Sequence, residues 1–143
     1  MSRSDLATTR ETVRAFYDVF LDSASTPAEI AGLFAEDAEW EIPGDPDVVP
    51  WVGKHHGRMA IAEAIAVLRA RTEPVSFEVD RLLAEEDAVV ALGHLVTRIP
   101  ATGRVIESAF AGHFTVTDGW ITSYRLLEDT WTVATAVRDL TVH

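Results

Sequence analysis

Residues 75–128 decide the fold, and they read VSFEVDRLLAEEDAVVALGHLVTRIPATGRVIESAFAGHFTVTDGWITSYRLLE. Alternating apolar and polar residues predict four strands, at 75–84, 88–99, 104–117 and 120–128. Turn residues separate them, at Glu85-Glu86-Asp87, Ala101-Thr102-Gly103 and Asp118-Gly119. Turns this short join antiparallel neighbours, because a parallel pair needs a crossover of roughly a dozen residues. The stretch therefore predicts an antiparallel meander.

Three amphipathic helices are predicted before the meander. The first carries one apolar stripe, formed by Val13, Phe16, Tyr17, Phe20 and Leu21. Thr26-Pro27-Ala28-Glu29 predicts the start of a short second helix through a capping box, with Ile30, Leu33 and Phe34 facing inward. The third runs over about 58–71 and ends before Pro74. Helices laid over a curved antiparallel sheet predict a cone with an internal pocket.

The remaining segments have weaker patterns. Residues 38–42 alternate as a strand, and the proline-rich and glycine-rich residues 43–57 predict a long irregular loop. A short last helix is expected after Asp129 or Thr130, with Trp131, Ala134 and Val137 packing inward.

Composition limits the function. The 143 residues are 48% apolar, contain no cysteine and carry a formal net charge of −11, which predicts a single globular domain over residues 1–143. Binding to nucleic acid or anionic membranes needs clustered cations, but Lys54 is the only lysine. No apolar run or signal pattern suggests membrane insertion or secretion, so a cytoplasmic protein is expected. We expect a small apolar molecule as partner, and no cofactor.

The element order and three local segments resemble the nuclear-transport-factor-2-like superfamily, which includes SnoaL-like and ketosteroid-isomerase-like proteins. The segments are LFAEDAEW at 33–40, PATGR at 100–104 and FTVTDGWI at 114–121. The resemblance implies an α+β, cystatin-like fold, a cone-shaped barrel of three N-terminal helices packed on a highly curved mixed β-sheet with an internal pocket. It also implies a homodimer through the exposed sheet face. It does not imply one function, because this fold hosts isomerases, hydrolases, cyclases and non-catalytic domains.

Two known chemistries of the superfamily are not preserved. Of the ketosteroid isomerase residues, the helix-one tyrosine matches Tyr17, but the general base matches Ile42 and the second oxyanion donor falls near Gly112. Limonene-epoxide hydrolases need a water-holding pair and an Asp-Arg-Asp network. The matching positions are Trp40, Ile42, Gly93, Leu95 and Leu126, and a one-residue slip replaces Leu95 with His94.

Glu128 is the sharpest candidate for a base. Counting alternation from Gly119 places Tyr124, Leu126 and Glu128 on the strand face that the resemblance turns toward the pocket. A carboxylate against Trp40 and Ile42 would have a raised pKa and act as a base. The alternative is a solvated strand end, or a helix cap formed by Glu128 and Asp129.

Other polar residues are candidates with competing structural roles. Tyr17 is a candidate donor in the pocket or a core residue, and the same holds for Tyr124. His94 and His113 have the intrinsic pKa for proton transfer, and SnoaL-type cyclases use a His-Asp pair, but alternation turns His113 to the outer face. His55 and Trp51 are expected in a lid at the mouth of the cone. No spacing supports a metal site.

Two functions remain open from the sequence. The first is a SnoaL-like enzyme that performs cofactor-free proton transfer on an apolar oxygenated substrate, as an isomerase, cyclase or epoxide hydrolase does. Its expected catalytic residues are Tyr17, Glu128, His94 and His113, and its expected ligand contacts are Trp40, Ile42, Trp51, His55, Tyr124 and Leu126. The second is a non-catalytic domain that binds a hydrophobic ligand or mediates dimerisation.

Overall fold

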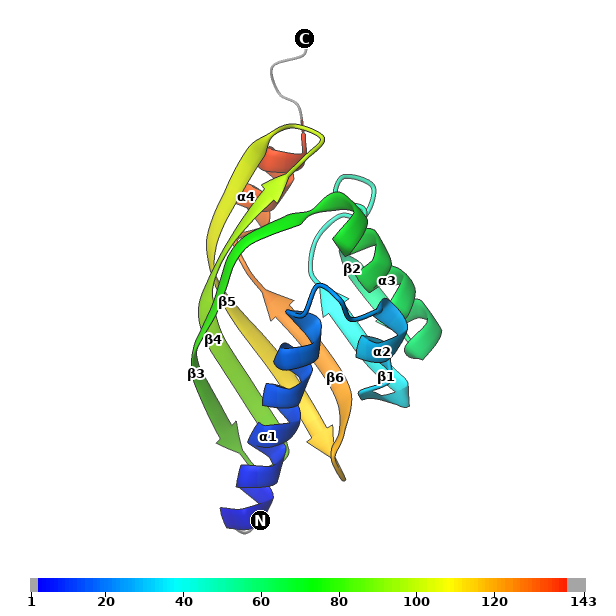
Figure 1. The fold of residues 1–143 in the computed structure, drawn as a ribbon, viewed down its shortest axis with the longest axis vertical. Coiled ribbons are helices and arrows are strands. Elements are labelled where there is room, and N and C mark those ends of the chain that lie inside the picture. The colour runs from blue at the N-terminus through cyan, green and yellow to red at the C-terminus, as the bar shows by residue number, and fades with distance from the viewer. Residues whose placement is uncertain (1–2, 139–143) are drawn as a thin grey trace.

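The computed structural model describes residues 3–138, and its centre is a six-stranded sheet with the order β2-β1-β6-β5-β4-β3. The strands are β1 (Phe34–Ile42), β2 (Gly53–His56), β3 (Glu73–Glu85), β4 (Ala88–Ile99), β5 (Arg104–Thr117) and β6 (Trp120–Leu127). Strands β1 and β6 are parallel, and the other neighbours are antiparallel. The sheet is strongly curved and open, with β2 and β3 at its edges (Figure 1). The predicted α+β fold and meander are confirmed, although the sheet does not close into a barrel.

The helices are α1 (Arg3–Phe20), α2 (Pro27–Ala31), α3 (Arg58–Arg71) and α4 (Thr130–Val137). Helix α2 begins with the predicted capping box: Thr26 Oγ1 accepts from the Glu29 amide at 3.1 Å, and Glu29 Oε1 accepts from the Thr26 amide at 3.3 Å. Among the residues that the structure describes, no helix is both long and apolar enough to cross a bilayer.

Helix α1 lies over the concave face of the sheet and supplies the centre of the core (Figure 1). Phe16 is fully buried, and its ring centroid lies 5.8 Å from that of Phe34, 5.3 Å from that of Phe114 and 5.7 Å from that of Tyr124. One residue therefore joins α1 to β1, β5 and β6. Burying such a ring contributes about 2 kcal/mol to folding.

The segment predicted as an irregular loop contains strand β2, so that prediction was wrong. Gly53–His56 pairs antiparallel with β1, and His55 lies opposite Trp40. The chain turns back on itself within 43–52, where Val48 and Val49 both donate to the Asp45 carbonyl. A four-residue edge strand after a proline-rich turn has too little alternation to be visible in the sequence.

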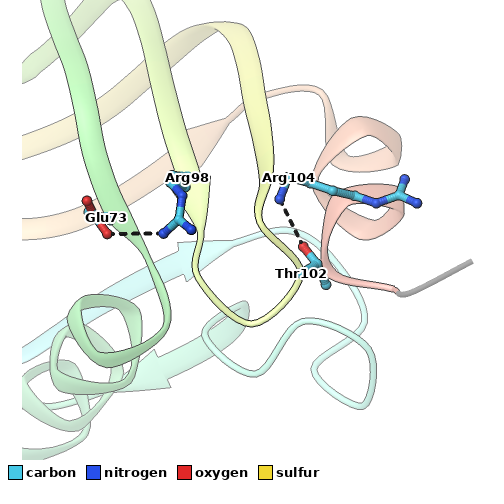
Figure 2. A network of polar contacts seen from close by, with 4 residues as sticks. All are labelled: Glu73, Arg98, Thr102 and Arg104. Carbon is cyan, nitrogen blue, oxygen red and sulfur yellow. Dashed lines mark hydrogen bonds and ion pairs between the residues drawn. The ribbon is translucent and has the colours of Figure 1, made fainter. Parts of the chain in front are cut away.

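Helix α4 packs with part of the predicted face, because Ala134 and Val137 lie half-buried against the core, but Trp131 does not pack inward. Val133 and Ala136 are buried, whereas Trp131 is 75% exposed. The helix begins at Thr130 because Asp129 caps it, accepting a hydrogen bond from the Thr132 amide at 3.0 Å. Thr102 holds the other end, because its hydroxyl donates to the Ala136 carbonyl at 2.7 Å. The same hydroxyl accepts from the Arg104 amide, as Figure 2 shows beside α4. The β4–β5 turn thus fixes the rotation of α4.

Candidate functional site

A cavity of about 580 Å³ lies between the sheet, α4 and the C-terminal ends of α1 and α3. Its walls are mostly apolar and include Phe20, Trp40, Ile42, Trp51, Phe77, Leu95, Ile106, Tyr124, Leu126 and Val133. Its size and lining are typical of a small-molecule site. We call this space the main cavity.

Glu128 is the single acidic residue in the lining of the main cavity among the described residues. It follows directly after β6, and Tyr124 and Leu126 line the cavity from the same strand, as the alternation predicted. The described ion pairs are His94–Asp80, Arg98–Glu73 and Arg125–Glu41, so none involves Glu128. Burial, assisted by the nearby charge of Asp129, raises the pKa of Glu128 from 4.5 to about 7.

Asp129 caps α4, whereas its neighbour Glu128 lines the main cavity. Hydrogen bonds from the Thr132 amide and side chain lower the pKa of the Asp129 carboxylate. Its charge therefore persists beside Glu128 and disfavours a second negative charge there. The alternative that Glu128 itself caps the last helix is not what the structure shows.

Tyr124 lines the main cavity together with Glu128 and has a hydroxyl group that can donate a hydrogen bond. Its ring packs between Trp40 and Phe114, with centroid distances of 4.6 and 4.7 Å. Burial raises the pKa of Tyr124, and the nearby Tyr17 and Glu128 raise it further. The hydroxyl therefore stays protonated and is available as a hydrogen-bond donor.

Tyr17 does not line the main cavity, which corrects the prediction of a pocket donor. Its ring packs against Phe77 and Phe114, both at 5.7 Å between centroids. Its hydroxyl is buried without a partner among the described residues, and a side chain at Gly112 would lie 2.8 Å from that hydroxyl. The glycine at the position of the second oxyanion donor thus leaves the space that the Tyr17 hydroxyl fills.

The three candidate histidines also lie away from the main cavity. His94 and His113 are on the outer sheet face, where the His94 ring is 69% exposed and Nδ1 lies 3.0 Å from Asp80 Oδ2. Their chain neighbours Leu95 and Phe114 are buried, so the alternation of strand side chains turns both histidines outward. His55 lies on β2, and its Nε2 is buried without a partner in the described part of the chain. It contributes no surface to the cavity.

Arg69 is a cavity residue that the sequence reasoning missed, and its charge is already engaged. Its guanidinium donates to the Phe20 carbonyl at 3.2 Å, the Asp22 carbonyl at 3.1 Å, the Ser25 hydroxyl at 2.9 Å and the Ser25 carbonyl. These bonds tie α3 to the C-terminal end of α1. No long-range sequence signal reveals such a contact, whereas strand alternation would have revealed Leu95 and Ile106.

The described residues contain no group of three His, Asp or Glu side chains close enough to hold a metal ion. Two of the residues that line the main cavity supply groups for proton chemistry, one carboxyl group of raised pKa and one protonated phenol, in a mostly apolar space. Such a pair can move a proton and hydrogen-bond an oxygen.

The fold and the main cavity define a class of protein, an open α+β cone with a small-molecule cavity on its concave side. Residues 13–124 match the family of SnoaL-like domains, and the chain belongs to that family. Among curated proteins, none matches this chain.

Solved structures show the same fold. An NTF2-like protein from Burkholderia xenovorans is 26% identical, with a TM-score of 0.82 over 93% of this chain and 98% of its own. A protein with a ketosteroid isomerase-like fold from Catenulispora acidiphila, in complex with trimethylamine, is 18% identical, with a TM-score of 0.73 over 89% and 92% of the two chains. TerC, co-crystallised with polyporic acid, is 20% identical, with a TM-score of 0.76 over 91% and 98%.

Proposed function

We propose that this protein is a cofactor-free enzyme that transfers a proton on an apolar oxygenated small molecule, with Glu128 as the base. The observation that carries this proposal is a carboxyl group that faces an apolar cavity, has a pKa of about 7 and has no ion-pair partner among the described residues. A base is most effective when its pKa lies near the working pH, because it is then both ionised and basic. Tyr124 would take the donor role expected of Tyr17 and hydrogen-bond the substrate oxygen.

The mechanism differs from those of the ketosteroid isomerases and limonene-epoxide hydrolases. Trp40 and Ile42, at positions where those enzymes carry polar groups, are apolar walls here. The base has moved to the end of β6, on the same strand as Tyr124. Two related structures, one in complex with trimethylamine and one co-crystallised with polyporic acid, support a small-molecule role for this fold.

A base in an apolar pocket can be tested without the natural substrate. Nitrobenzisoxazole gives up its ring C–H proton to a base, the C–H electrons form a nitrile, and the N–O bond breaks to a coloured phenolate. We expect the protein to accelerate this reaction, with a rate that rises as pH increases through about 7. Glu128→Gln should lower the rate by roughly 100-fold. Absorbance of the phenolate measures the rate.

The matched control is Glu107→Gln, which removes an exposed carboxylate from β5. Its rate and pH profile should equal those of the unaltered protein. Equal rates for the Glu128 and Glu107 variants would contradict the proposal, because the reaction would then come from surface carboxylates.

A non-catalytic ligand-binding domain is the second candidate, and the apolar Trp40 and Ile42 favour it. Binding of the neutral fluorescent probe phenylnaphthylamine, together with no ring opening of nitrobenzisoxazole, would select this candidate. Ring opening that depends on Glu128 would select the enzyme.

We also propose that the protein forms a homodimer through the outer sheet face. Leu92, Ala111 and Leu127 lie side by side across β4, β5 and β6 on that face, next to Val90. Light scattering at micromolar concentration should give twice the 15.7 kDa of one chain. Leu92→Glu should give the mass of one chain, because it places charge in the middle of this apolar row. A single-chain mass for the unaltered protein would rule out the dimer.

A further inference from the structure

A second, smaller cavity lies on the other side of the main cavity's wall. It measures about 100 Å³ and sits between α4 and the loop at 43–52. Glu128 and Val133 line both cavities, so these two residues form the partition between them. Asp45, Thr130 and Arg138 give the second cavity a polar border.

Size decides what each cavity can hold. About 100 Å³ has room for a few water molecules but is well below the roughly 300 Å³ at which small-molecule sites begin. The main cavity, at about 580 Å³, is within that range. A ligand that fills the main cavity would remove water from its side of Glu128 and leave the side of the second cavity unaffected.

We infer that the second cavity is a rear solvent port, through which the Glu128 carboxyl exchanges its proton with bulk water while the main cavity is occupied. Polar groups at the border are either fixed or exposed. Asp45 accepts the Asp47 amide at 2.9 Å, Asp129 beside Glu128 is committed to capping α4, and Arg138 is exposed. None of them closes the port with an ion pair to Glu128 among the described residues.

The port indicates which kind of proton-transfer reaction the enzyme catalyses. This conclusion rests on the proposed function of Glu128 as base. An enzyme that returns one proton to another carbon of its substrate must shield the base from water, since proton leakage would compete. A base that is open to water at the rear suits a reaction whose proton leaves to solvent, such as an elimination or a ring closure. If a product also takes up a proton from Glu128, that proton would come from solvent and not from the substrate.

Cysteine accessibility tests the port directly. The chain has no native cysteine, so Glu128→Cys supplies a single thiol at the partition. Its reaction with the small neutral reagent methyl methanethiosulfonate is followed by mass spectrometry. The reaction is run with phenylnaphthylamine in the main cavity, because position 128 lines both cavities and the reagent would otherwise also arrive from the main one. Ala134→Leu and Val48→Phe fill the second cavity from different elements, and each should then slow this reaction roughly tenfold, because access limits thiol reactivity.

Thr97→Cys is the matched reporter, because Thr97 lines the main cavity alone. The two filling variants should leave its reaction rate unchanged, which also shows that they are folded. Phenylnaphthylamine should protect the thiol at position 97 more than the thiol at 128. The port is refuted if filling the second cavity slows neither reporter, or slows both equally.

The outcome is separable from that of the proposed function. A port that is present in a protein that does not open nitrobenzisoxazole would leave the cavity assignment standing and remove the role of Glu128 as base. Ring opening that depends on Glu128, in a protein whose second cavity fails the cysteine test, would support Glu128 as the base and remove the port.

Discussion

Gly93→Ala is expected to destabilise the protein by about 3 kcal/mol or more, a large part of an ordinary free energy of unfolding of about 5–15 kcal/mol. A Cβ at position 93 would lie 1.9 Å from the Glu78 carbonyl oxygen and 2.8 Å from two ring atoms of Phe110. The first of these neighbours is backbone, so no side-chain rotation relieves the overlap. Strand β3 would have to move away from β4.

The β3 backbone comes this close to Gly93 at a point where the register of the sheet shifts. Gly93 lies opposite Val79 on one side and Phe110 on the other, and the β3–β4 register shifts between Val79 and Arg81. A glycine inside a strand permits a bend and a short distance between backbones. Figure 1 shows β3 curving around the concave side of the sheet. Residues of this strand, among them Phe77, line the main cavity. Unfolding of the variant in urea, followed by circular dichroism, measures the loss.

Gly103→Ala is the matched control in the turn between β4 and β5. Gly103 has φ of +74°, and a Cβ there meets nothing within 4 Å. The substitution should therefore cost about 1 kcal/mol, from the left-handed backbone alone. If Gly93→Ala and Gly103→Ala reduce stability equally, the close contact at Gly93 is not what requires the glycine.

The meander could be predicted because the residues that determine its turns and strand faces lie close together in the sequence. Asp118 and Gly119 have φ of 52° and 82°, and such a pair is typical of a two-residue hairpin. Alternation then fixed the faces of β6 and placed Tyr124, Leu126 and Glu128 together. It also turned His113 outward, as the structure shows.

The missed features depend on contacts between distant segments. Strand β2 exists because it pairs with β1, and the rotation of α4 depends on the Thr102 bond to Ala136. Tyr17 lies on the predicted stripe of α1, but whether its hydroxyl reaches a cavity depends on the missing side chain at Gly112. A helical stripe identifies the buried face and not the depth of each residue in it.

Glu128→Gln is expected to make the protein more stable at neutral and alkaline pH. The folded protein binds this proton up to a pKa of about 7, whereas the unfolded chain releases it near 4.5. Between these values the folded state holds more protons, so the contribution of Glu128 to stability falls as pH rises. Above about pH 7 the ionised carboxylate costs about 3 kcal/mol, from a pKa difference of roughly 2.5.

The difference between the variant and the unaltered protein isolates this effect. Urea unfolding from pH 4 to 8 should give a free energy of unfolding whose difference, variant minus unaltered, increases by about 3 kcal/mol across that range. Glu107→Gln, at an exposed site, controls for the loss of one negative charge from a chain of net charge −11. A difference that does not change with pH would mean that Glu128 titrates alike in both states. A difference that grows as expected would show that the carboxyl lowers the stability of the fold, and a group that is unfavourable for folding at the wall of an apolar cavity needs a reason in function.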